Sequence, residues 1–322
     1  MWDGPVPCLG DVYLARRRLA PYLSPTPELK PAALRRRLGL DIRLKLENLL
    51  PIGAFKIRGG INLMAAEAER LRGRTVYAAS TGNHGQSVAY AARLFGLPAV
   101  IYAPVGANPL KVESMRALGA EVVLQGRDFD EAREACEAAA RSHQGRYIHS
   151  MNEPLLIAGV GTLYLEALEA DPDLEVLLVP VGGGSGVSAA GLVAKAVNPA
   201  IRVIGVQAEG APAFYRSFQS GEPESTETME TQAEGLATRT AFELPLTMAR
   251  RYVDEMVLVS DEEMFEAMRL ILETAHVVAE MAGAAAVAAA AKRASDLAGR
   301  RILAVVSGGN ATLDQLRTLL GS

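Results

Sequence analysis

The sequence has few cysteines and no excess of positive charge, and each scarcity excludes a class of protein. Its 322 residues include only Cys8 and Cys136, which lie far apart. This argues against a disulfide framework or a zinc site and favours a reducing compartment. The four histidines show no metal-ligand spacing. Lysine and arginine number 33 against 37 acidic residues, a net charge of −4, so neither a nucleic acid nor an anionic membrane is expected as a partner.

Long apolar runs are also scarce. The N-terminus has no basic segment leading into an apolar run, so no secretory signal is expected. The alanine-rich stretch 279–291 comes closest to a membrane span, but it is short, small-sided and bordered by Glu280 and Lys292. A closely packed helix fits it better. With 49% hydrophobic and 22% charged residues, the chain has the composition of a soluble globular enzyme, and we expect a cytoplasmic protein.

Short β-branched runs alternate with segments of helical period along the chain. Helices are expected at 86–95, 110–118, 130–141, 187–196 and 262–274, the last opened by a capping box at Ser260. Several of the expected strands are apolar almost throughout, as strands covered on both faces are; they are 41–47, 75–79, 99–103, 121–124, 147–149, 176–181, 203–207, 256–259 and 302–306. This alternation predicts an α/β fold of two domains with twisted, mostly parallel sheets flanked by helices.

Lys56 stands in an unusual local context. It lies in Gly53-Ala54-Phe55-Lys56-Ile57-Arg58-Gly59, where a glycine-flanked loop follows a strand-like run and leads into a predicted helix. Phe55 and Ile57 make part of its surroundings apolar. Desolvation lowers the pKa of a lysine and frees its amine to attack a carbonyl. These residues alone leave two interpretations open, a half-buried structural lysine or a reactive amine.

A glycine cluster directly follows the predicted strand 176–181. A helix-like segment comes after the cluster, which consists of Gly182, Gly183, Gly184, Ser185 and Gly186. Glycines let consecutive N–H groups point into one concavity, and a helix N-terminus adds partial positive charge, so the loop suits a phosphate. A tight strand–helix turn would need only one or two glycines.

The same segment also fits a dinucleotide-binding fingerprint. Gly184, Gly186 and Ala189 have the G-x-G-x-x-A spacing, and Glu209 follows the next strand as a ribose-binding carboxylate would. This alternative implies an NAD-dependent oxidoreductase. A lone fingerprint of this kind is weak evidence, and it leaves Lys56 unexplained.

Two further polar loops follow predicted strands. The first runs from Ser80 to Gln86, and its hydroxyls, amide and backbone N–H groups at a helix start suit a small carboxylate. Ser80 by itself also fits a plain helix cap. The second loop, Ser307-Gly308-Gly309-Asn310, offers a neutral hydroxyl. Loops at the carboxyl ends of parallel strands converge on the ligand site.

Taken together, these segments resemble the pyridoxal-phosphate enzymes of the tryptophan-synthase-β fold, in the branch of serine/threonine dehydratases and serine racemases. The resemblance covers most of the chain, in the family's order. Residues 47–59 resemble the Schiff-base segment, 80–86 the carboxylate loop, 182–186 the phosphate cup, 233–237 the segment facing substrate and 307–310 the pyridine-nitrogen site. It implies a large cofactor-binding domain of residues 1–50 and 151–322, and a smaller inserted domain of residues 51–150 that carries the carboxylate loop.

The resemblance also implies a role for each matching residue. Lys56 would hold pyridoxal 5'-phosphate as a Schiff base and serve as the α-proton base. The remaining cofactor contacts would be Phe55, Asn83, Gly182, Gly183, Gly184, Ser185, Gly186, Glu280 and Ser307. Contacts to the amino-acid substrate would be Ser80, Thr81, Gly82, His84 and Gly235. A serine rather than a carboxylate at 307 should leave the pyridine nitrogen neutral, which favours loss of a β-leaving group. The implied reaction is β-elimination of water from L-threonine or L-serine, giving a 2-oxo acid and ammonia.

Two alternatives within the family stay open. Thr81 matches a serine that serves the opposite face of the substrate in the racemase branch, so it is a second catalytic candidate and an amino-acid racemase is one alternative. Departures from the family pattern at Ala54, Val160 and Met281 leave the substrate open. A dehydratase or lyase for another β-hydroxy amino acid, such as those of hydroxyectoine-type catabolism, is the second alternative.

The resemblance bears on metal binding and assembly as well. Gln207 and Ala213 stand where relatives that bind a divalent cation have acidic residues, and a hard cation prefers carboxylate oxygens. No metal site is therefore predicted. A homodimer is expected from the resemblance and from the general prevalence of two-fold oligomers.

Overall fold

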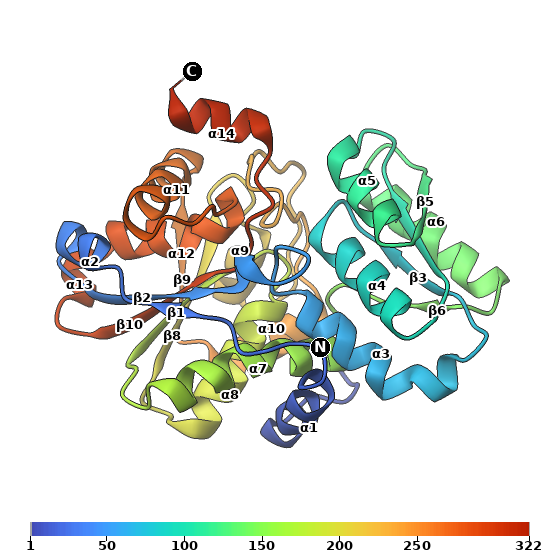
Figure 1. The fold of residues 1–322 in the computed structure, drawn as a ribbon, viewed down its shortest axis with the longest axis horizontal. Helices are drawn as coiled ribbons and strands as arrows, with labels where there is room; N and C mark the ends of the chain where they lie inside the picture. The colour runs from blue at the N-terminus through green and yellow to red at the C-terminus, as the bar shows by residue number, and fades with distance from the viewer. Residues whose placement is uncertain (1, 322) are drawn as a thin grey trace.

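The computed structural model describes residues 2–321 and contains two separate sheets (Figure 1). The larger sheet has the order β1-β2-β10-β7-β8-β9, and only β1 runs antiparallel to its neighbour. Its strands are β1 (Glu28–Leu29), β2 (Asp41–Leu46), β10 (Arg301–Val306), β7 (Val176–Pro180), β8 (Arg202–Ala208) and β9 (Glu255–Val259). Crossovers between parallel neighbours place helices on both faces of this sheet.

Alternate residues of β10 show how the two faces are filled. Ile302, Ala304 and Val306 pack into the cluster formed with α2 (Ala32–Leu38), α11 (Asp261–Ala275) and α12 (Met281–Lys292). Leu303 and Val305 point to the other face, which is covered by α1 (Leu9–Leu19), α7 (Pro154–Ala170), α8 (Ser185–Val197) and α10 (Glu243–Tyr252). The same part of the molecule as the larger sheet also contains shorter helices: η1 (Glu47–Leu49), α9 (Ala213–Ser220), α13 (Ala294–Leu297) and α14 (Leu313–Leu320).

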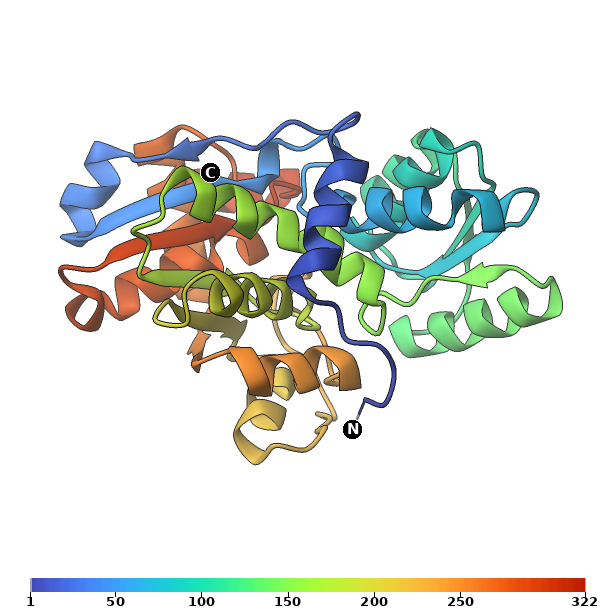
Figure 2. The same cartoon turned by 90° about the horizontal axis from the view of Figure 1, so that it is seen from below.

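The smaller sheet is entirely parallel, with the order β5-β4-β3-β6. Its strands are β3 (Val76–Ala79), β4 (Ala99–Ala103), β5 (Glu121–Leu124) and β6 (Arg146–Tyr147). One face packs against α3 (Ile57–Leu71), α4 (Asn83–Leu94) and α5 (Pro109–Ala117), and the other against α6 (Phe129–Ser142). The two sheets lie side by side in the molecule, joined through α3, which packs on α7 (Figures 1 and 2).

The predicted α/β architecture with mostly parallel sheets is confirmed. All nine predicted strands are present, although that predicted at 147–149 is the two-residue β6 at Arg146–Tyr147. Helix α4 begins at Asn83, three residues before the predicted start at Gln86. The capping box at Ser260 is also present, with its hydroxyl accepting from the N–H of Glu263. The assignment of residues 51–150 to an inserted domain stays a prediction.

The alanine-rich stretch forms the buried helix α12, whose residues from Met281 to Ala290 are all buried. Small side chains let it pack closely against both α11 and the large sheet. Within residues 2–321 no helix is long and apolar enough to span a membrane.

A buried ionic network lies directly beneath the start of α3. The Arg58 guanidinium forms paired hydrogen bonds to Glu47, at 2.7 and 2.9 Å, and to Glu166, at 2.6 and 2.9 Å. The ammonium of Lys45 lies 2.9 Å from Oε2 of Glu166, which also accepts a hydrogen bond from Arg58. Two cations thus face two carboxylates at close range, which compensates the buried charges, and a third carboxylate, Glu28, lies 3.8 Å from Lys45. Because these partners come from β2, η1 and α7, the network fixes the helix start that follows Lys56.

Replacing Arg58 with methionine should destabilise the protein strongly, because Glu47 is fully buried and would lose its cation. Breaking a buried pair in this way costs about 3–5 kcal/mol, which denaturant unfolding followed by circular dichroism would measure. Arg72→Met is the matched control, since Arg72 is exposed at the other end of α3 and its ion pair is worth at most about 1 kcal/mol. Equal losses for both variants would contradict the structural role of the network.

Candidate functional site

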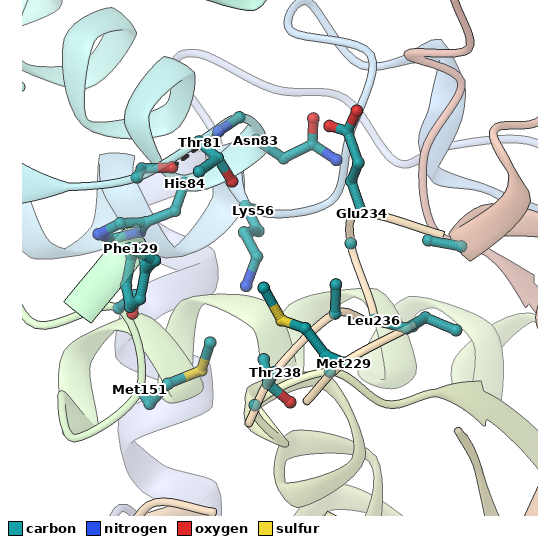
Figure 3. A pocket seen from close by; sticks show the side chains of 18 of the residues that line it. Lys56, Thr81, Asn83, His84, Phe129, Met151, Met229, Glu234, Leu236 and Thr238 are labelled. Atoms are coloured by element: carbon teal, nitrogen blue, oxygen red, sulfur yellow. Dashed lines mark hydrogen bonds between the residues drawn. The ribbon is translucent and has the colours of Figure 1, made fainter. Parts of the chain in front are cut away.

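The carboxyl ends of parallel strands from both sheets open onto one cavity of about 400 Å³. Its walls include Ser80 after β3, Pro104 after β4, Gly182 after β7 and Ser307 after β10. This is where wound parallel sheets place their ligands. Every residue proposed above for cofactor or substrate lines this cavity, and part of the wall is shown in Figure 3.

Lys56 lies at the start of α3, and hydrogen bonds to the backbone of residues 55 and 56 hold it in place. The Ser87 hydroxyl donates to the Lys56 carbonyl at 2.6 Å, and the Phe55 N–H donates to the Ser307 carbonyl at 3.0 Å. The side chain reaches into the cavity (Figure 3), with Nζ 5.0 Å from the centroid of the Phe55 ring. Within residues 2–321 its ammonium makes no hydrogen bond or ion pair.

Desolvation lowers the pKa of Lys56 to about 8, and the negative charge of Glu280 opposes this shift only in part. A lysine without a close carboxylate and with a lowered pKa supplies neutral amine near physiological pH. The structure therefore favours the reactive amine over the structural lysine.

The glycine loop after β7 follows the cavity wall and leads into α8 at Ser185. Packing or backbone conformation explains three of its glycines. A Cβ on Gly183 would lie 2.0 Å from Met151 Sδ. A Cβ on Gly182 would lie 2.4 Å from the carbonyl of Gly235, and Gly184 has φ +95°, a conformation that side chains disfavour. Packing does not explain Gly186, where a Cβ would meet no atom closer than 3.7 Å.

A ligand that approaches the backbone would account for Gly186. The first N–H groups of α8 have no acceptor within the helix, and the helix dipole adds partial positive charge there. With no charged side chain in residues 182–186, this loop fits a phosphate held by backbone donors.

The loop between β3 and α4 is only partly free to bind a ligand. The Ser80 hydroxyl accepts from the Gly82 N–H at 3.0 Å, so it neither caps α4 nor leaves that N–H available. Thr81 is partly exposed on the cavity wall (Figure 3) and makes no side-chain hydrogen bond within the described chain. The start of α4 directs its remaining backbone donors toward the same wall.

His84 is buried at the start of α4 and faces the cavity (Figure 3). Desolvation, helped by the nearby charge of Lys56, lowers its pKa to about 3. The ring is therefore neutral at physiological pH, and its Nε2 lies 3.4 Å from the Ile148 carbonyl. A neutral imidazole offers a hydrogen bond to a ligand and no charge.

The side chain of Asn83 is held by one carboxyl partner and one amide partner. Its Nδ2 donates to Glu280 Oε1 at 2.8 Å, and its Oδ1 accepts from Asn310 at 2.8 Å. Desolvation raises the pKa of the buried Glu280 carboxyl, while Lys111 and Asn83 oppose the shift. Ser307 is only 8% exposed, and its hydroxyl faces the cavity without a hydrogen-bond partner among residues 2–321.

Two ion pairs on the cavity wall were not predicted from the sequence. Lys111 of α5 pairs with Glu234, and Arg239 donates to Asp130 of α6 at 2.7 Å. The partners in each pair lie more than 100 residues apart, so no local spacing could have indicated either pair. All four side chains line the cavity.

The walls fit a ligand with an aldehyde, a phosphate and a ring nitrogen, as pyridoxal phosphate has. Lys56 offers an amine without a partner, residues 182–186 offer backbone donors, and Ser307 offers a neutral hydroxyl. The dinucleotide interpretation fits less well, because Glu209 lies outside the cavity wall and pairs with Lys292 at 3.1 Å.

Comparison with known proteins agrees with this fit. A family model described as "Pyridoxal-phosphate dependent enzyme" matches residues 19–308. L-threonine ammonia-lyase of Thermotoga maritima is 41% identical over 97% of this chain and 78% of its own. L-threo-3-hydroxyaspartate ammonia-lyase of Saccharomyces cerevisiae is 34% identical over 98% of this chain and 97% of its own. Among solved structures, maize serine racemase has a TM-score of 0.93, with 30% identity and 98% of each chain covered.

The apo-protein should attach pyridoxal phosphate with a pH dependence unlike that of a surface lysine. Only the neutral amine reacts, and its fraction increases as pH rises through the Lys56 pKa of about 8. The rate of appearance of the visible absorbance should therefore rise from about pH 7 and level off near pH 9, whereas an ordinary lysine, of pKa about 10.4, responds at higher pH. A free lysine derivative titrated in parallel controls for the ionisation of the cofactor. A rate that tracks this free amine would contradict the lowered pKa.

Proposed function

The chain belongs to the pyridoxal-phosphate dependent enzymes, and from this premise we propose that it removes water from L-threonine and L-serine, giving a 2-oxo acid and ammonia. The observation that carries the proposal is the unpaired Lys56 ammonium, desolvated in a cavity that also presents the glycine loop and the Ser307 hydroxyl. The similarity to L-threonine ammonia-lyase supports this substrate choice.

Each wall of the cavity has a distinct part in the proposed reaction. Residues 182–186 would hold the phosphate, Phe55 would lie beside the ring, and Asn83 and Glu280 would border its hydroxyl. When bound, the cofactor withdraws electrons from the α-carbon of the amino acid. Lys56 would hold the cofactor and, once the substrate amine has taken its place, would take the α-proton at Nζ.

The substrate would be oriented by uncharged groups. Its carboxylate suits the start of α4, where Thr81, Gly82 and His84 meet the helix N-terminus, and Gly235 borders it from the opposite wall. Ser80 contributes indirectly, since its hydroxyl is bonded to Gly82. Lys56 and Thr81 are the residues that we propose act on the substrate chemically.

Ser307 bears on which reaction follows proton removal. The Ser307 hydroxyl would accept or donate one hydrogen bond at the pyridine nitrogen without adding charge, so it would not hold that nitrogen protonated as a carboxylate would. The bound cofactor would then supply a weaker electron sink, and prompt departure of the β-hydroxyl would be favoured. This favours elimination over racemisation.

Racemisation remains the second candidate because of Thr81. Its hydroxyl lies on the cavity wall without a hydrogen-bond partner within the described chain, so it is available to return a proton to the α-carbon. The similarity to maize serine racemase is in keeping with this activity. Acting on another β-hydroxy amino acid is the remaining variant of the proposed function.

We further infer that the protein works as a homodimer in the cytoplasm. Two-fold oligomers are the commonest assemblies of soluble enzymes, and a chain with two separate free cysteines suits a reducing compartment. We also propose that residues 51–150 act as a smaller domain that carries the Ser80–His84 loop.

Incubating the holoenzyme with L-threonine, L-serine and their D-enantiomers tests the proposal. The L-enantiomers should give 2-oxo acid and ammonia, together with a slower or undetectable change in the enantiomer ratio. Chiral chromatography and an oxo-acid assay measure both outcomes in the same sample. Enantiomer exchange faster than oxo-acid release would favour the racemase, and oxo acid from none of the four would refute the substrate assignment.

Lys56→Ala serves as the negative control in that assay. Removal of the α-proton base should lower kcat by at least about 1,000-fold and abolish the visible absorbance of the lysine-linked cofactor. Lys30→Ala, at an exposed lysine outside the cavity, should change neither property. A Lys56→Ala enzyme with near-normal turnover would contradict the assigned role.

A further inference from the structure

The cations that line the cavity are already paired. Apart from Lys56, the lysine and arginine side chains on its wall are Lys111 and Arg239. Lys111 forms an ion pair with Glu234, and Arg239 lies 2.7 Å from Asp130 and 3.9 Å from Asp128. Each cation therefore has a carboxylate partner before any ligand arrives.

The same wall carries more carboxylates than cations. Asp128, Asp130, Glu234 and Glu280 all line the cavity, and desolvation raises the pKa of Glu280. Lys56 is committed to the cofactor in the proposed holoenzyme, and the cofactor brings a phosphate. The histidine on the wall, His84, adds no positive charge because its pKa is lowered to about 3.

A substrate with a single carboxylate is accommodated by this arrangement. The loop before α4 and its helix N-terminus provide neutral and dipolar donors for that one group. A second carboxylate on the substrate side chain would meet Asp130 and Glu234 beside Arg239 and Lys111. Both carboxylates are partly exposed, and bringing a like charge next to them is unfavourable.

We propose that Asp130 and Glu234 make the enzyme select amino acids with one carboxylate, because each neutralises a cation that would otherwise bind a second one. The inference rests on the proposed function and adds the residues that determine its specificity. It predicts that L-threonine is preferred over L-threo-3-hydroxyaspartate, the compound in the name of the yeast relative, L-threo-3-hydroxyaspartate ammonia-lyase.

Comparing kcat/KM for L-threonine and L-threo-3-hydroxyaspartate tests this selection. The wild-type enzyme should favour L-threonine by about tenfold or more, since like charges repel but these two carboxylates are partly exposed and screened by solvent. Asp130→Asn removes the 2.7 Å partner of Arg239 and leaves only Asp128, at 3.9 Å. Glu234→Gln removes the partner of Lys111, so each variant should lower the preference several-fold. Asp128 is left intact because it caps α6 by accepting from the Glu131 N–H.

Glu134→Gln is the matched control. It removes one negative charge from an exposed position on the same helix α6 and lies outside the cavity wall, so it should leave the preference unchanged. Equal use of the two substrates by the wild type would overturn the proposal. So would changes in preference no larger for Asp130→Asn and Glu234→Gln than for the control.

A binding experiment separates this proposal from the elimination reaction. L-asparagine and L-aspartate have nearly the same shape and differ in charge, and binding of either should change the visible spectrum of the holoenzyme. The concentration that gives half the spectral change should be at least about tenfold lower for L-asparagine than for L-aspartate. In the Asp130→Asn variant this difference in concentration should be smaller. Equal responses would refute the selection even if L-threonine is consumed. If no hydroxy amino acid is consumed but L-asparagine still binds more tightly than L-aspartate, the proposed reaction is refuted and the selection against a second carboxylate is supported.

Discussion

Backbone hydrogen bonds between residues 53–55 and 307–309 hold the two essential parts of the cavity together. The Phe55 N–H donates to the Ser307 carbonyl at 3.0 Å, and the Gly309 N–H donates to the Gly53 carbonyl at 2.9 Å. These bonds join the segment before α3 to the end of β10, so Lys56 and Ser307 lie on one wall although they are far apart in sequence. Gly308 is needed at this junction, because a Cβ there would lie 2.1 Å from Glu280 Oε1.

The chemistry of the site follows from how its charges are arranged around this junction. Charges that stabilise the fold, such as Arg58 with Glu47 and Glu166, are paired outside the cavity wall, whereas the Lys56 ammonium on that wall is left unpaired. Burial without a partner lowers the pKa of that one lysine. The charged side chains at the cavity's outer wall are paired again, and the proposed reaction therefore takes place between neutral donors at the loop before α4 and the glycine loop.

Much of the fold and the site could be predicted because the signals are local. Apolar strand runs, the glycine cluster and the polar loops after strands each occupy a few consecutive residues, and parallel-sheet geometry then brings the loops together. The start of α4 was predicted three residues late because Asn83, His84 and Gly85 lack an apolar periodic pattern. The pairs Lys111–Glu234 and Arg239–Asp130 were missed because their partners come from different lobes, where only the folded chain sets their distance. The spacing also could not show that the Ser80 hydroxyl bonds to the Gly82 N–H.

The central claim is that Lys56 alone carries the cofactor. Borohydride reduction of the holoenzyme fixes the pyridoxyl group to whichever amine holds it, and peptide mass spectrometry then locates the modified lysine. The account predicts one pyridoxyl group per chain on the peptide containing Lys56, with the visible absorbance lost in proportion to the modification. A pyridoxyl group on Lys111 or on another lysine, with Lys56 unmodified, would contradict it.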